Sequence, residues 1–122
     1  MVIFTRTYEF VSWIIPLSLK FPRSQRFVVT QRLQQAVLNL QELLIQANVR
    51  RGRERRDALL AADAALVTVK LYLRLCHRWQ WLSNGQFQRA SEQAVEIGKL
   101  LGGWIKTVTG TTRSDEAPSK AA

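Results

Sequence analysis

The side chains in this sequence that could do chemistry are cations, and they gather in two groups on one long segment. The first group is Arg50, Arg51, Arg53, Arg55 and Arg56, and the second is Lys70, Arg74 and Arg78. An arginine guanidinium presents a planar fork of donors to phosphate oxygens, and each phosphate that a cation neutralises releases counterions. These residues therefore predict binding to a nucleic-acid backbone, with little dependence on nucleotide sequence.

Two ring side chains accompany the second group. With residues placed 100° apart on a helix, His77 and Trp81 fall on the same narrow strip as Lys70 and Arg74. We interpret His77 as a polar contact of this strip rather than as a metal ligand. The Trp81 ring could stack on an unpaired base, and packing inside the protein is the alternative.

Signatures of catalysis are missing from the sequence. It contains no GxSxG, HExxH or phosphate-binding glycine loop, and no paired ExxH metal ligands. One His and one Cys, adjacent at positions 77 and 76, cannot form a structural zinc site by themselves. We predict a non-enzymatic protein with no catalytic residue, metal or cofactor.

The overall charge points to the same class of partner. The 122 residues include 18 basic and 9 acidic side chains, a formal net charge of +9. Such a balance attracts polyanions, first of all nucleic acid. The single Cys excludes an internal disulfide and fits a reducing cytoplasm, where we expect the protein to work. No apolar run reaches the eighteen or so residues of a membrane span, so we expect no membrane partner.

Helical spacing of apolar residues covers most of the chain. The expected helices are Thr5–Leu19, bent at Pro16; Gln25–Asn48, capped by Ser24; Arg53–Leu82; and Gln86–Val108. Short breaks between them predict an all-α, antiparallel, up-down four-helix bundle over residues 1–109, followed by a disordered tail over 110–122. The core positions expected on the first helix are Tyr8, Val11, Ile15 and Leu19. On the last helix, Gly98 and Gly102 are expected to allow close approach of another helix.

The third helix is apolar around more of its circumference than a surface helix needs. Leu66, Val69, Leu73 and Cys76 form one flank, and Ala64, Leu71, Leu75 and Leu82 form the other. A surface helix usually buries a stripe of roughly 100°, and here the apolar arc is about twice as wide. We therefore expect this helix to contact its own bundle and also another subunit, which predicts a homo-oligomer.

Two segments together resemble a known family. The first is LLAADAALVTVKLYLRLCHRWQWL, residues 59–82, and the second is EIGKLLGGWIKTV, residues 96–108. Their order and spacing resemble the accessory variability determinant (Avd) proteins of diversity-generating retroelements. The stretch from Tyr8 to Pro16 and the Phe21-Pro22-Arg23 break also resemble the wider family of four-helix-bundle proteins encoded in ribosomal RNA intervening sequences.

The resemblance implies more than the residues do by themselves. It implies a ring-like homopentamer that binds the retroelement's reverse transcriptase and its template-repeat RNA and supports mutagenic cDNA synthesis. By position, Lys70, Arg74 and Arg78 would contact the polyanion or the polymerase. The cluster at 50–56 is denser than the family pattern, and its role stays open between a peripheral RNA contact and a solvated turn.

Two alternatives belong to other classes of protein. One is a structural four-helix bundle of the intervening-sequence kind with no reverse transcriptase partner. The other is an amphipathic bundle on a membrane surface, which co-flotation with anionic vesicles would detect.

Overall fold

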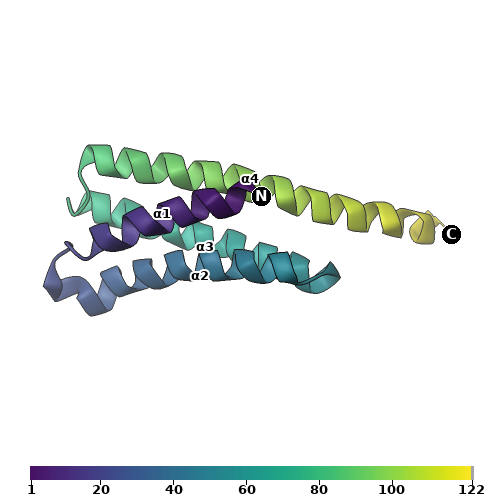
Figure 1. The fold of residues 1–122 in the computed structure, drawn as a ribbon, viewed down its shortest axis with the longest axis horizontal. Helices are drawn as coiled ribbons and strands as arrows, with labels where there is room; N and C mark the ends of the chain where they lie inside the picture. Colours follow the sequence, from purple (N-terminus) through teal and green to yellow (C-terminus); the bar gives the residue numbers. More distant parts are fainter. Residues whose placement is uncertain (122) are drawn as a thin grey trace.

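The computed structural model describes the backbone of residues 1–121 and the side chains of residues 1–109. This part of the chain forms the helices α1 (Val2–Ser18), α2 (Gln31–Val49), α3 (Gly52–Arg78) and α4 (Asn84–Ala121). Two short helical turns, η1 (Arg23–Gln25) and η2 (Arg26–Thr30), join α1 to α2. None of residues 1–121 forms a strand. The predicted all-α four-helix bundle is confirmed (Figure 1).

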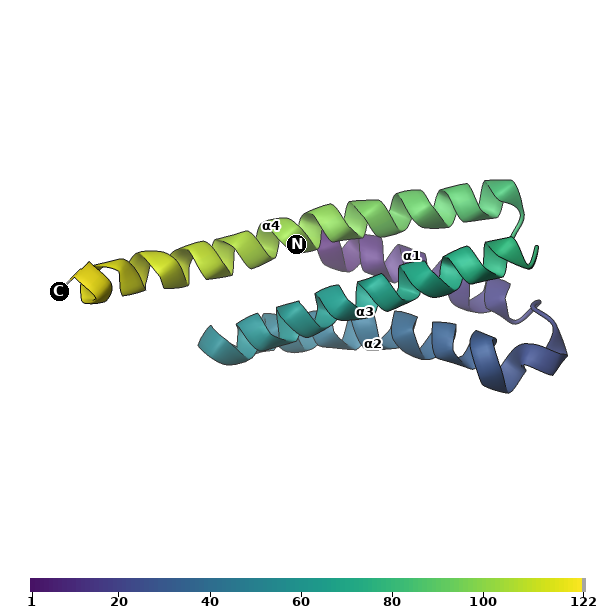
Figure 2. The ribbon, with the colours of Figure 1, turned by 180° about the vertical axis from the view of Figure 1, so that it is seen from behind.

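Consecutive helices run in opposite directions, as an up-down bundle requires (Figures 1 and 2). Each helix packs on the next one along the chain, and α1 also packs on α4, which closes the bundle. The α1–α2 and α3–α4 connectors lie at one end, and the α2–α3 turn lies at the other. We call the first the double-turn end and the second the single-turn end.

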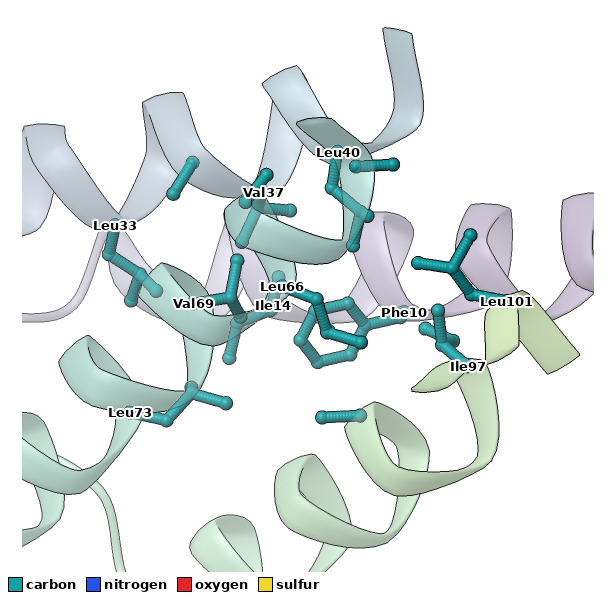
Figure 3. Packing of buried hydrophobic residues seen from close by; sticks show 14 of the residues in the cluster. Phe10, Ile14, Leu33, Val37, Leu40, Leu66, Val69, Leu73, Ile97 and Leu101 are labelled. Atoms are coloured by element: carbon teal, nitrogen blue, oxygen red, sulfur yellow. The ribbon is translucent and has the colours of Figure 1, made fainter. Parts of the chain in front are cut away.

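The core is built mainly from aliphatic side chains of all four helices, together with the aromatic residues Phe10, Phe21 and Trp104 (Figure 3). Helical spacing also predicts an apolar seam on the second and the fourth helix, and all of these positions are buried or half-buried in the core. They are Val29, Leu33, Ala36, Leu40, Leu43 and Ala47 on the second helix, and Phe87, Ala90, Ala94, Ile97, Leu101, Ile105 and Val108 on the fourth. Full burial of one such side chain contributes about 1.5–3 kcal/mol. The labelled members are Phe10, Ile14, Leu33, Val37, Leu40, Leu66, Val69, Leu73, Ile97 and Leu101.

The buried face of α1 differs from the predicted one. Of the predicted positions, Val11 and Ile15 are half-buried against the core, but Tyr8 and Leu19 are exposed. The fully buried residues are Phe10 and Ile14, so the centre of the buried face is offset by one residue, or about 100° of rotation. The apolar runs of α1 offer two faces of similar hydrophobicity. The face that packs on the bundle also carries the polar residues Thr7 and Ser18.

The entry to α2 also differs from the prediction. Ser24 makes no capping hydrogen bond and lies inside η1, which begins after Pro22. The chain then makes one wider turn, η2, before the regular α2 helix starts at Gln31. Pro16 lies in the last turn of α1, and its carbonyl accepts a hydrogen bond from the Leu19 N–H group at 3.2 Å.

The α3 helix ends at Arg78, four residues before the predicted end at Leu82. The Trp81 N–H group donates to the Cys76 carbonyl at 2.8 Å, and the Gln80 N–H group donates to the His77 carbonyl at 2.9 Å. With Gln80 at φ +64°, this is a Schellman-type helix end. Glycine usually occupies the left-handed position of such a helix end. Because Gln80 stands there instead, the sequence did not predict that α3 ends at Arg78.

The α4 helix begins with a capping box. The Gln86 N–H group donates to Ser83 Oγ at 3.1 Å, and the Ser83 N–H group donates to Gln86 Oε1 at 2.9 Å. Gly98 lies against α3, because a Cβ atom there would meet Leu66 at 3.4 Å, but Gly102 has open space. The predicted close approach therefore holds for Gly98 and is wrong within this chain for Gly102.

Two further predictions concern the C-terminal tail and the absence of a membrane span. The expected disordered tail, 110–122, falls outside the residues whose side chains are described, and it stays a prediction. Among the described residues, none of the helices combines the length and hydrophobicity that crossing a bilayer requires.

Candidate nucleic-acid interface

The second cationic group lies along the last part of α3, toward the double-turn end. Lys70, Arg74 and Arg78 are all exposed, and none of them forms an ion pair with a carboxylate of residues 1–109. Their four-residue spacing places them on neighbouring turns of one face. We call these three residues the α3 strip. Three uncompensated cations on one rigid helix form a surface suited to phosphate groups, and their binding role stays a prediction.

A groove between α3 and α4 runs beside the α3 strip. It has a volume of about 200 Å³. Its lining includes the apolar residues Leu73, Phe87 and Val95 and two cations of the α3 strip, Lys70 and Arg74. Apolar atoms thus adjoin two of the three strip cations. A cationic edge beside an apolar floor is suited to a partner that presents both an anionic group and an apolar one.

His77 packs toward α4 instead of standing free on the strip. Its ring stacks on Phe87 with centroids 4.2 Å apart and an interplanar angle of 3°. Its Nε2 atom also forms a hydrogen bond with Asn84 Oδ1 at 2.8 Å. These contacts tie the end of α3 to the start of α4, so His77 holds the turn in place.

Trp81 does not lie on the α3 strip, because the helix ends before it. The Trp81 ring is half-buried and packs between Phe21, at 5.7 Å between centroids, and Trp79, at 5.1 Å. The geometry therefore favours the packing alternative for Trp81. The more exposed ring of this group is Trp79.

The arginine cluster at 50–56 lies at the single-turn end, far from the α3 strip. At 1.5 Å per residue, Arg53 and Arg74 are about 30 Å apart along α3. Arg51 and Arg53 are exposed, and Arg56 is half-exposed. With residues 100° apart, Arg56 falls on the same side of the helix as Lys70. The length of α3 nevertheless separates them, so the two groups form separate surfaces.

Two arginines of this cluster already have partners. Arg55 Nε donates to the carbonyls of Ala47, at 2.8 Å, and Arg50, at 2.9 Å, and its Nη2 donates to the Asn48 carbonyl at 3.2 Å. Carbonyls in the last turn of a helix lack partners within the helix, so Arg55 caps α2. Arg50 pairs with Glu54 at 3.0 Å on the surface.

A third basic segment was not predicted from the sequence. Residues 10–41 contain four cations and no acidic residue at all. Those at the double-turn end are Lys20, Arg23 and Arg26, all exposed. Counting acidic residues along the chain would have revealed this segment, because its charge comes from missing carboxylates and not from a dense arginine run.

Other charged groups serve the bundle itself. Arg6 Nε donates to Glu96 Oε1 at 2.7 Å, which links α1 to α4, and this carboxylate raises the pKa of Arg6. The Arg89 guanidinium lies 4.3 Å from the centre of the Trp13 ring. Burial raises the pKa of the Cys76 thiol to about 11. That thiol is therefore protonated and unreactive at neutral pH.

The fold and its surfaces define a four-helix bundle with cationic groups on α3 and at the double-turn end. The sequence matches the bAvd-like family over residues 1–108. Because this match spans nearly all of the bundle, the chain belongs to the bAvd-like family and is an Avd-type protein.

A solved structure shares the same fold. It is a protein of unknown function from the S23 ribosomal protein family of Bacteroides thetaiotaomicron, 21% identical in sequence, with a TM-score of 0.78. The alignment covers 85% of this chain and 98% of that one. The comparison with curated proteins gives no match.

Proposed function

We propose that this protein is a non-enzymatic accessory subunit of a diversity-generating retroelement. In this role it binds the element's reverse transcriptase and template-repeat RNA and supports mutagenic cDNA synthesis, in the cytoplasm where both are made. The observation that carries the proposal is the α3 strip, three exposed cations without a carboxylate partner among residues 1–109, on a chain of the bAvd-like family. The polymerase supplies the chemistry, and this protein supplies a charged, rigid surface.

The proposal includes self-association. Leu60, Ala64, Val67 and Leu71 are exposed on α3, at successive spacings of four, three and four residues. Val67 is 62% exposed. This spacing keeps apolar residues on one seam of a helix, as in coiled coils, and the bundle's own core uses a different face of α3. The exposed seam supports a homo-oligomer, and the family resemblance supplies the ring of five.

The binding role is tested by removing equal charge from the two ends of α3. The variant K70A/R74A/R78A should bind template-repeat RNA or the polymerase more weakly and should keep its oligomeric size. For RNA, the log–log salt slope should fall in magnitude by roughly 2 to 3, because three phosphate contacts are lost.

The matched control is R51A/R53A/R56A, which removes the same charge from the single-turn end of the same helix. It should reduce RNA and polymerase binding less. If the two triple variants behave alike, net charge governs binding and the α3 strip has no special role.

Self-association is tested by placing one charge on the exposed seam. Val67→Glu should lower the mass measured by light scattering, because a carboxylate would be buried between subunits. The matched control is Gln31→Glu, which adds the same charge at an exposed position at the start of α2, away from the seam on α3, and should leave the mass unchanged. A wild-type protein that is monomeric at micromolar concentration would rule out this part of the proposal.

The alternative is a structural bundle without a polymerase partner. A reverse transcriptase gene and a pair of near-identical repeats beside the gene would support the retroelement role. A gene inside a ribosomal RNA intervening sequence would support the structural alternative instead.

A further inference from the structure

Three aromatic rings form a continuous ladder across the double-turn end. Phe21 belongs to the α1–α2 connector, and Trp79 and Trp81 belong to the α3–α4 connector. Phe21 lies 5.7 Å from Trp81 at an interplanar angle of 43°, and Trp81 lies 5.1 Å from Trp79 at 46°. The ladder joins two connectors that are about sixty residues apart in the sequence.

Packing accounts for only part of this ladder. Phe21 is buried and Trp81 is half-buried, so both stabilise the contact between the connectors. Trp79 is 45% exposed, and Phe27 on the neighbouring η2 turn is 78% exposed. An aromatic ring that is open to solvent offers a face on which an unpaired base can stack. The Schellman-type helix end at Gln80 holds Trp79 in this outward position.

Cations lie near both ends of the ladder. Arg23 and Arg26 line a hollow of about 150 Å³ that Phe21 also lines. Arg78 directly precedes Trp79 and ends the α3 strip. Neither Arg23, Arg26 nor Arg78 forms an ion pair within residues 1–109. Cations next to exposed ring faces are the arrangement that proteins use for single-stranded nucleic acid, because phosphates meet the cations and unpaired bases stack on the rings.

We propose that the double-turn end is a platform for single-stranded nucleic acid. An unpaired base stacks on Trp79, and the flanking phosphates contact Arg78 on one side and Arg23 and Arg26 on the other. A base inside a duplex cannot reach the ring, because its faces are already covered by its neighbours. The platform deepens the proposed function, on which it rests, by naming the strand type that the protein prefers.

The experiment measures fluorescence anisotropy with a labelled RNA of about 12 nucleotides, within the site sizes of single-strand binders, and with the matched duplex. Trp79→Ala should weaken binding to the single strand by about 5- to 100-fold, the range expected for one lost base stack. It should leave duplex binding unchanged. Trp79→Phe keeps a ring and should stay within about threefold of wild type.

Two further variants separate stacking from folding and charge. Trp79→Leu keeps an apolar contact with Trp81 but has no ring, so it should fold normally and lose single-strand binding as Trp79→Ala does. Tyr8→Ala removes a ring that is 65% exposed on α1, away from the platform, and should change nothing. R23A/R26A should weaken binding to both strand types, because phosphates are common to both.

Several results would overturn the platform. Single-strand binding by Trp79→Leu at the wild-type level would remove the stacking step, and an equal loss of duplex binding would remove the strand preference. A fall in oligomer mass for Trp79→Leu would identify Trp79 as a subunit contact. If the platform fails while K70A/R74A/R78A still weakens RNA or polymerase binding, the proposed function stands without it. If the wild-type protein binds neither RNA nor polymerase, both the platform and the proposed function are wrong.

Discussion

Replacing Arg55 distinguishes a structural arginine from a phosphate-binding one within the cluster at the single-turn end. Its guanidinium donates to the carbonyls of Ala47 and Asn48, in the last turn of α2, and to that of Arg50. The Gln46 carbonyl already accepts a hydrogen bond from the Arg50 N–H group at 3.0 Å. Arg55→Ala therefore removes the side-chain donor that caps the remaining end of α2.

The size of the effect follows from the exposure of the site. A hydrogen bond to a charged group contributes about 1.5–3 kcal/mol when it is well buried. Arg55 is half-exposed, so water replaces part of what is lost, and we expect a loss of about 1–2 kcal/mol in the free energy of unfolding. With a urea slope of about 2 kcal/mol per molar, the midpoint should fall by about 0.5–1 M.

The assay is urea unfolding followed by circular dichroism, with Arg53→Ala as the matched control. Arg53 is exposed on the same turn, and its removal should change stability by less than about 0.5 kcal/mol. Arg55→Lys keeps the charge but lacks the planar fork, so it should be destabilised nearly as much as Arg55→Ala. If Arg55→Ala and Arg53→Ala unfold at the same urea concentration, the capping role is wrong.

Four other changes test separate features of the bundle. Gln80→Gly should raise the melting temperature by a few degrees, since a side chain in the left-handed region costs roughly 1 kcal/mol; a lower melting temperature would contradict this helix end. Ser83→Ala should cost about 1 kcal/mol, and a double-mutant cycle with Gln86→Ala should show that the two effects are coupled. Thr7→Val should stabilise the protein by about 1 kcal/mol in urea unfolding, because the buried Thr7 hydroxyl has no hydrogen-bond partner. The raised pKa of Cys76 means that its protonated form stabilises the fold below pH 9 and that this contribution is lost as pH rises from about 9 to 11; Cys76→Ala should show a shallower loss of stability over that range.

The buried faces of α2 and α4 were predictable because the apolar residues of each helix lie on a single face. The α2 and α4 seams alternate clearly with polar residues, and the structure buries most of what the spacing indicated. On α1 the apolar runs allowed two faces, and tertiary packing selected the one with Phe10 and Ile14. A periodicity argument cannot rank two faces of similar hydrophobicity.

The candidate site was also only partly predictable from the sequence. The α3 strip was found from residue type and spacing alone, and its exposure agrees with a surface role. Trp81 was assigned to that strip by extending the helix to Leu82, and the helix end at Arg78 removed it. His77 lies within α3, but its ring packs on Phe87 of α4. The platform at the double-turn end was not found, because it joins residues from two connectors.

The order of amino acids by itself determined that this protein is a basic, all-α bundle whose third helix carries spaced cations. Those properties depend on side-chain type and on helical spacing, which are local. Only the tertiary structure decided that Arg55 caps α2 and that Phe21 contacts Trp81. The Arg55 contacts depend on where α2 ends, and the Phe21–Trp81 contact joins two connectors about sixty residues apart, so it depends on how the helices pack.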